Sequence, residues 1–132
     1  MTKFYAHSLE GRPPAEWQPL AVHLQNVAEL AAGFAVPFGG DEWTRLAGLW
    51  HDLGKYSDAF QAKLYAENGY ESHLETRRGR VVHSEAGGHL ACLRGARGID
   101  RVLSWMIMGH HVGLSSISSK IGVDIFGGNK FV

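Results

Sequence analysis

The chain carries an ordered series of histidines with one aspartate, and these residue types suit a metal centre. The series consists of His23, His51, Asp52, His83, His110 and His111. Imidazole nitrogens and carboxylate oxygens are common ligands of first-row transition metals. Six such residues are enough for two ions that share the carboxylate, and two ions about 3.5–4 Å apart are a recurring device for hydrolysing phosphate esters. The series therefore predicts a metal site suited to phosphate-ester hydrolysis.

The first histidine of the series lies in a predicted helix over residues 16–34. Apolar residues recur there at near-helical spacing, at Leu20, Leu24, Val27, Ala31 and Phe34. His23 follows Leu20 by three positions, so we expect it to face the core side of this helix. Pro37 and the pair Gly39-Gly40 should end the element.

The pair His51-Asp52 lies at the end of a second predicted helix. Asp41 is a suitable N-cap for it, and Gly54 is a natural C-terminal stop. Its apolar face would be formed by Leu46, Leu49, Trp50 and Leu53. Both ligand candidates would then sit in the last turn, where adjacent residues can lean into one pocket.

The remaining ligand candidates are also predicted at helix ends. Ser57 is expected to cap a third helix, and residues 67–80 form the best loop candidate. His83 then precedes a predicted helix that begins at Ser84-Glu85 and stops near Gly95 or Gly98. Asp100 would cap the last helix, with Val102, Leu103, Met106 and Ile107 buried and His110-His111 at its end. No strand is clearly signalled. We therefore predict an all-α fold.

Composition limits the classes of protein to which the chain can belong. Its 132 residues, 45% hydrophobic and 20% charged, fit one globular domain. Thirteen basic and thirteen acidic residues give no net charge, which argues against sequence-blind capture of nucleic acid by electrostatics alone. A local basic patch remains as a candidate nucleic-acid contact: Arg77, Arg78 and Arg80.

Cysteine usage and hydropathy predict a cytoplasmic protein. Cys92 is the only cysteine, so no intrachain disulfide can form and a reducing cytoplasm is the simplest setting. Residues 1–14 contain no long apolar run, so no signal peptide is expected. No stretch approaches the roughly 20 apolar residues that span a bilayer, and no membrane partner is expected.

Several short segments around the series carry a family resemblance. They are Tyr5-Ala6-His7-Ser8, Trp17-Gln18-Pro19-Leu20, Ala47-Gly48-Leu49-Trp50-His51-Asp52-Leu53-Gly54-Lys55, Phe60-Gln61, Val82-His83-Ser84-Glu85-Ala86-Gly87 and Gly109-His110-His111-Val112-Gly113-Leu114. Their order resembles the HD superfamily of metal-dependent phosphohydrolases. More narrowly, the chain looks like the HD nuclease domain of the type I CRISPR-associated helicase-nuclease over about residues 4–114. The resemblance implies an HD-domain helical bundle around the histidine/aspartate site.

The resemblance also implies a role for each ligand candidate. His23, His51 and Asp52 would hold one ion, while Asp52 would bridge to a second ion held with the remaining three ligands, His83, His110 and His111. The catalytic residues would be Asp52 and Lys55, with Lys55 projecting one turn beyond the metals to neutralise the phosphate or its transition state. A nitrogen-rich ligand set favours Mn, Fe, Co, Ni or Zn over Mg, without choosing among them. His7 would contact the metal ligands without binding a metal itself.

The chain departs from the family pattern after the second histidine pair. The family's domain is longer, and a later aspartate completes the first metal site. Here the only acid after His111 is Asp124, in a Gly/Ser-rich tail at the wrong spacing. We therefore expect a partial, C-terminally truncated HD nuclease-like domain at residues 1–114 and a poorly specified tail at residues 115–132, which leaves the first ion short of one ligand.

Three functions compete. The leading one is an antiviral nuclease domain that cuts single-stranded DNA in type I CRISPR interference, by attack of a metal-activated hydroxide on phosphorus, with the CRISPR helicase portion and surveillance complex as partners. The second is an HD phosphohydrolase of nucleotides or cyclic dinucleotides. The cyclic-dinucleotide branch continues after its histidine pair with an acid and a Gly-Tyr-Pro motif, where this chain has Val112-Gly113-Leu114. The third is a non-catalytic metal-binding module that docks onto a partner.

Overall fold

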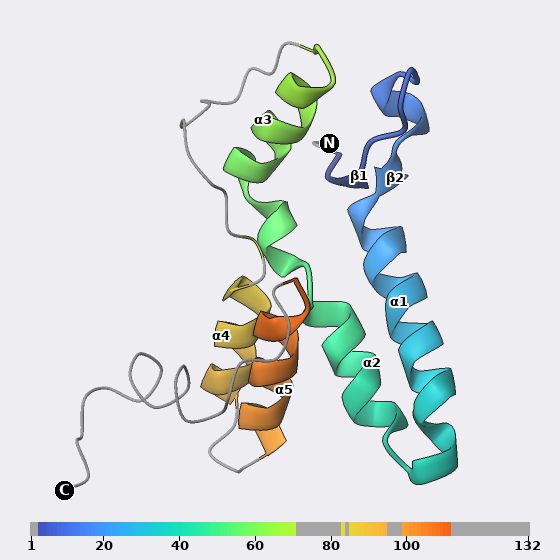
Figure 1. Ribbon diagram of the computed structural model, residues 1–132, viewed down its shortest axis with the longest axis vertical. Coiled ribbons are helices and arrows are strands. Elements are labelled where there is room, and N and C mark those ends of the chain that lie inside the picture. Colours follow the sequence, from blue (N-terminus) through green and yellow to red (C-terminus); the bar gives the residue numbers. More distant parts are fainter. Residues whose placement is uncertain (1–2, 71–82, 84, 95–98, 112–132) are drawn as a thin grey trace, which may run out of the picture.

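The computed structural model describes residues 3–70, 83, 85–94 and 99–111, which fold into helices with one small sheet (Figure 1). These residues form five α-helices: α1 (Leu20–Ala35), α2 (Asp41–Trp50), α3 (Asp58–Glu67), α4 (Glu85–Arg94) and α5 (Ile99–Gly109). They also form three short 3-10 helices and two strands: η1 (Pro14–Glu16), η2 (Val36–Phe38), η3 (Leu53–Tyr56), β1 (Tyr5–His7) and β2 (Gln18–Pro19). The predicted helical fold class is confirmed.

The helices are arranged as two neighbouring pairs. Figure 1 shows α1 beside α2 and α4 beside α5, with the end of α2 leading toward the second pair. After η2, Gly39 adopts a left-handed conformation with φ of 69°, and the chain turns back so that α2 runs opposite to α1. Gly48 of α2 lies against the backbone of Ala28, where any side chain would clash. This close crossing brings the start of α1 next to the end of α2.

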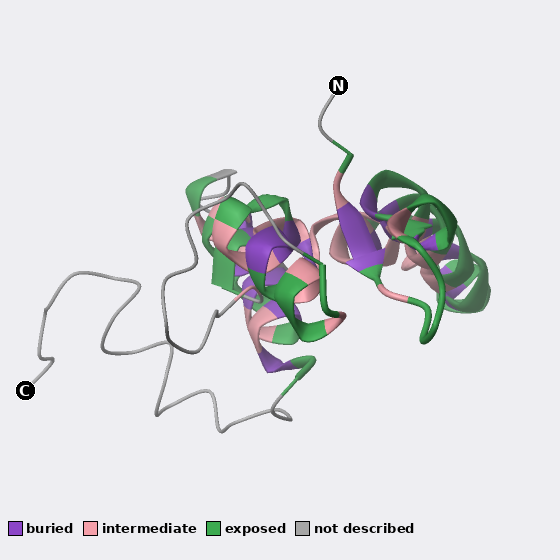
Figure 2. Cartoon of the chain, turned by 90° about the horizontal axis from the view of Figure 1, so that it is seen from above, coloured by how far each residue is buried: buried purple, intermediate pink, exposed green. Residues whose placement is uncertain are grey.

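Two small clusters of buried residues form part of the apolar core, and Figure 2 shows buried and exposed residues on different parts of each helix. The first cluster consists of Ala6, Leu20 and Leu24, and the second of Ala91, Leu103 and Ile107. Three residues of α2, namely Leu46, Ala47 and Trp50, pack against the second cluster. Helix α2 therefore contacts α1 on one side and the α4–α5 pair on the other.

The predicted core is partly wrong. The buried residues of α1 are Leu20, Leu24, Ala28, Ala32 and Ala35, whereas Phe34 is 73% exposed. The small alanines let α2 approach, so the large side chain of Phe34 is left outside the contact. In α5, Leu103 and Ile107 are buried as predicted, but Val102 and Met106 are 48% and 42% exposed because they lie one position, about 100° of rotation, away from that row.

The predicted helix caps are confirmed at one end and corrected at two others. The Ser57 hydroxyl accepts a hydrogen bond from the backbone N–H of Phe60 at 3.3 Å, so it caps α3 as expected. Asp41 is the first residue of α2 rather than its cap, which is Gly40. Asp100 is likewise inside α5, as its second residue. Both carboxylates still lie in a first turn, where the helix dipole favours negative charge.

The two-stranded sheet was not expected from the sequence. Strands β1 and β2 pair antiparallel, with Tyr5 opposite Pro19 and His7 opposite Gln18. Alternation becomes a useful signal over about four to eight residues, and both strands are shorter. Among the described helices, none has the length and apolar character needed to cross a lipid bilayer.

Candidate metal centre

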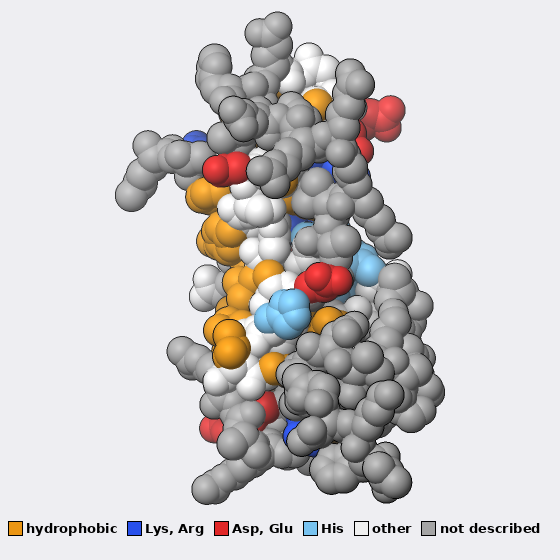
Figure 3. All heavy atoms as spheres, turned by 90° about the vertical axis from the view of Figure 1, so that its left-hand side faces the viewer, with side chains coloured by type: hydrophobic (Ala, Val, Ile, Leu, Met, Phe, Trp, Pro, Cys, Tyr) orange, Lys and Arg blue, Asp and Glu red, His pale blue; other side chains and the backbone are white. Residues whose placement is uncertain are grey.

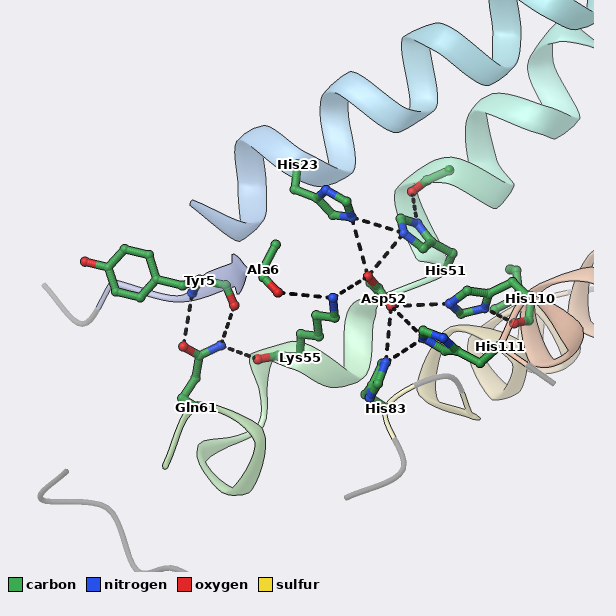
Figure 4. A network of polar contacts seen from close by, with 12 residues as sticks. Tyr5, Ala6, His23, His51, Asp52, Lys55, Gln61, His83, His110 and His111 are labelled. Carbon is green, nitrogen blue, oxygen red and sulfur yellow. Dashed lines mark hydrogen bonds and ion pairs between the residues drawn. The ribbon is translucent and has the colours of Figure 1, made fainter. Parts of the chain in front are cut away.

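The six ligand candidates come together around the carboxylate of Asp52, as Figure 4 shows. His23 comes from the first turn of α1, and His51 and Asp52 follow the last residue of α2. His83 precedes α4, and His110 and His111 follow α5. Four helix ends therefore meet at one point, which was predicted for His51-Asp52, His83 and His110-His111. His23 was expected inside a helix, but it lies in the first turn because α1 begins at Leu20.

One oxygen of Asp52 faces the first pair of histidines. Asp52 Oδ2 lies 3.4 Å from His23 Nε2 and 3.2 Å from His51 Nε2. The two Nε2 atoms are 3.2 Å from each other. We call these three residues the first donor group; their ligand atoms all lie within 4.8 Å of one another.

The other oxygen faces the remaining histidines. Asp52 Oδ1 lies 3.7 Å from the Nε2 atoms of both His83 and His111, and 3.4 Å from His110 Nε2. The ligand atoms of Asp52, His83 and His111 also lie within 4.8 Å of one another, and His110 joins them through its contact with Asp52 Oδ1. We call these four residues the second donor group. The single carboxylate thus belongs to both groups, one oxygen to each.

Backbone carbonyls orient two of the imidazole rings. His51 Nδ1 donates to the carbonyl of Gly48 at 2.7 Å, and His110 Nδ1 donates to the carbonyl of Ile107. A proton held on Nδ1 leaves the lone pair of Nε2 directed at Asp52. Such contacts fix the ring orientation and tautomer that a metal ligand needs.

The donor atoms of the first group are spaced as the ligands of one first-row divalent ion would be. Two ligand atoms about 2.1 Å from one ion are separated by roughly 3.0–3.5 Å at bond angles of 90–110°. In the first donor group the separations are 3.2–3.4 Å. Asp52 Oδ1 is buried and has no hydrogen bond of ordinary geometry within the described part of the chain. A buried carboxylate oxygen surrounded by imidazoles is best explained by a shared cation.

Two glycines allow the backbones at the centre to approach closely. A side chain at Gly54 would clash with the backbone of His83, and one at Gly87 would clash with the carbonyl of Trp50. The prediction that Gly54 stops α2 is wrong, because α2 has already ended at Trp50 and Gly54 lies within η3. Glycine inside a helical element is the sequence signal that could have indicated this close approach.

Lys55 lies inside the cluster rather than one turn beyond it. Its side chain is 5% exposed, and Nζ lies 2.9 Å from Asp52 Oδ2. Nζ also donates to the carbonyl of Ala6 in β1 at 3.1 Å and lies 5.4 Å from the centre of the Phe60 ring. The predicted direction of this side chain is therefore corrected.

Gln61, buried in α3, connects β1 to the centre, a role that the sequence did not predict. Its amide exchanges two hydrogen bonds with the backbone of Tyr5, at 3.0 and 2.9 Å, as a neighbouring strand would (Figure 4). Its Nε2 also donates to the carbonyl of Lys55 at 2.7 Å. In the sequence, Gln61 stands out only as part of the fragment Phe60-Gln61. A single glutamine that binds the backbone of a distant strand produces no periodic pattern from which its role could be predicted.

The electrostatics of the cluster favour a charged aspartate. Burial raises the pKa of Asp52, but polar contacts with His110, His51 and Lys55 lower it by more, so it lies well below its usual range. Contact with Asp52 raises the pKa of His110 above the ordinary histidine value. Burial lowers the pKa of His23 and His111, and the neighbouring imidazoles lower it further. The anion at the centre therefore faces less basic imidazoles at His23 and His111 and a more basic one at His110.

The centre opens toward the ends of α4 and α5. The side chain of Asp52 is 4% exposed, whereas those of His110 and His111 are 25% and 45% exposed. His7, on β1, is also exposed, and its ring packs edge-on against His23 at 5.0 Å. Figure 3 shows one face of the molecule on which histidine and acidic side chains reach the surface next to hydrophobic ones.

Some sequence predictions fall outside the described residues. The basic patch Arg77, Arg78 and Arg80, the tail at residues 115–132 and Asp124 all belong to this part of the chain. The division at residue 114 also stays a prediction, as do the ligand and catalytic roles of the clustered residues.

Comparison with known proteins agrees with the geometry of the centre. No curated protein shows significant similarity to the chain. The sequence does match the family described as Cas3, HD domain, over residues 6–121, which covers all six ligand candidates as well as Lys55 and Gln61. HD domains of this kind are metal-dependent phosphohydrolases, in agreement with the histidine/aspartate cluster. The chain belongs to the Cas3 HD domain family.

Proposed function

We propose that this chain is a metal-dependent nuclease domain that hydrolyses the phosphodiester bonds of single-stranded DNA in type I CRISPR interference. The observation that carries the proposal is the sharing of Asp52 between two donor groups, one through each oxygen. His23, His51 and Asp52 would hold one ion, and Asp52 with His83, His110 and His111 would hold another. Bound ions supply an activated water and polarise the phosphoryl oxygens.

The residues of the chain prepare this chemistry by fixing charge and orientation. Asp52 is ionised and buried, so its charge is available to cations and is little screened by water. The carbonyls of Gly48 and Ile107 hold two rings with Nε2 directed inward. Lys55 adds a fixed positive charge beside the carboxylate. A phosphate would approach over His110 and His111, the most exposed members of the cluster.

The proposed partners follow from the family and from charge. A chain with no net charge attracts nucleic acid only weakly by itself. We therefore propose that the CRISPR helicase portion and surveillance complex present the DNA strand to it, in the cytoplasm. Arg77, Arg78 and Arg80 are proposed backbone contacts. Metals of the Mn, Fe, Co, Ni and Zn group are proposed over Mg because most donor atoms are nitrogen.

Cleavage of end-labelled single-stranded DNA by the purified chain, with Mn, Co or Ni added, tests the proposal. Asp52→Asn keeps the shape of the side chain but removes the charge that both groups share, so cleavage should fall by at least about 100-fold. Asp58→Asn makes the same change at an exposed position in α3 and should leave cleavage unchanged.

The outcome separates the proposal from its two alternatives. Equal cleavage by wild type and Asp52→Asn contradicts it. Faster hydrolysis of a panel of nucleotides and cyclic dinucleotides than of DNA would favour a small-molecule phosphohydrolase. Metal binding without hydrolysis of any phosphodiester would favour a docking module.

A further inference from the structure

Lys55 and the first donor group use the same carboxylate oxygen. The Nζ atom of Lys55 is 2.9 Å from Asp52 Oδ2, closer than His51 Nε2 at 3.2 Å or His23 Nε2 at 3.4 Å. The ammonium is also bound by the carbonyl of Ala6 at 3.1 Å, and its side chain is 5% exposed. It is therefore a fixed cation of the centre rather than a solvated surface charge.

The second donor group has no such competitor in the described part of the chain. Asp52 Oδ1 is approached by the Nε2 atoms of His83, His110 and His111, and no lysine or arginine of the described residues forms an ion pair with this oxygen. The second group also has four protein donors against three in the first. Like charges that share one ligand atom repel strongly where water is excluded.

We propose that Lys55 makes the two donor groups unequal. By sharing Asp52 Oδ2 it weakens binding of a divalent ion at His23 and His51, so the ion at the second group binds first and more tightly. This inference rests on the proposed metal-dependent function but concerns affinity at each group rather than hydrolysis.

The same contacts give Lys55 an opposite effect on the protein without metal. It joins Asp52 to β1 through Ala6, and its removal would leave the buried carboxylate without its nearest cation. Loss of the charge should therefore lower the stability of the metal-free protein while raising affinity for metal at the first group. A purely structural lysine would lower both.

The test is a competition titration of Zn or Mn against a metal-binding dye, at one fixed pH, on the full chain. Wild type should bind in a tight step and a weak step, and His23→Ala should remove the weak step alone. Lys55→Met, which keeps an unbranched apolar side chain but removes the ammonium near Phe60, should tighten the weak step about tenfold or more and leave the tight step unchanged. Lys63→Met is the matched control, since Lys63 is exposed on α3.

Two further measurements secure the result. Lys55→Gln keeps a hydrogen-bond donor but no charge, and should also tighten the weak step. Urea unfolding of Lys55→Met in EDTA should occur at a lower midpoint than that of wild type. The inference is overturned if Lys55→Met weakens both steps or leaves the weak step unchanged, or if wild type binds in two equal steps. Each of these results leaves the proposed function intact. A wild type that binds no ion overturns the proposed function together with the inference.

Discussion

At the scale of residues, Asp52 organises the centre because its two oxygens face different sets of nitrogen atoms. Oδ2 faces His23, His51 and Lys55, and Oδ1 faces three histidines. The ligand types and their order are visible in the sequence, so the members of this cluster could be predicted. The direction of Lys55 could not, because it depends on a carbonyl of β1, far away in the chain.

The raised pKa of His110 predicts that metal binding at the second donor group depends on pH. A pKa above the ordinary value means that more of this imidazole is protonated at neutral pH, and an ion must displace that proton. His23 and His111 have lowered pKa values and are already neutral. Affinity should therefore fall as the pH is lowered from about 8 to about 6, where an ordinary histidine titrates.

Calorimetric titration of metal in buffers with different ionisation enthalpies measures the protons released. Wild type should release protons on binding at neutral pH, and His110→Gln should release fewer. Equal proton release by the two proteins would contradict the raised pKa of His110.

At the scale of elements, the centre is a junction of helix ends, and these ends can lie close together because glycines at the contacts have no side chain. Gly48 lets α2 approach α1, while Gly54 and Gly87 let the backbones of η3 and α4 approach His83 and Trp50. Apolar spacing was enough to predict that His51-Asp52, His83 and His110-His111 lie near helix ends, although the stop expected at Gly54 was misplaced because α2 ends at Trp50. Apolar spacing could not identify the glycine contacts, because close approach depends on the partner backbone.

Gly54→Ala should damage the second donor group more than the fold. The new methyl group would collide with the backbone of His83 and move that imidazole away from Asp52. We expect a stability loss of about 1–3 kcal/mol, typical of overpacking, and weaker metal binding. Chemical unfolding and metal titration measure the two effects.

Gly33→Ala provides the matched control. Gly33 lies in α1 with open space around it, so alanine should stabilise the protein by about 0.5–1 kcal/mol through helix propensity. Metal binding should stay unchanged. If Gly54→Ala behaves like Gly33→Ala, the close approach of η3 to His83 does not shape the centre.

At the scale of the whole molecule, the centre lies where the two helix pairs meet. The α1–α2 pair supplies His23, His51 and Asp52, and the α4–α5 pair supplies His83, His110 and His111. Helical periodicity predicted the elements but not their mutual packing, so Phe34 and Met106 were wrongly placed in the core. The small sheet was missed because it depends on Gln61 and on two strands too short to show alternation.

The metal content of each chain is the most direct test, because both donor groups depend on Asp52. After saturation with Mn, Co or Zn and removal of loosely held metal, mass spectrometry should find at least one ion per wild-type chain, and two at higher free metal. Asp52→Ala should bind none, and His111→Ala should lose the tightly held ion first. A wild type without metal, or Asp52→Ala with the same metal content, would contradict the account.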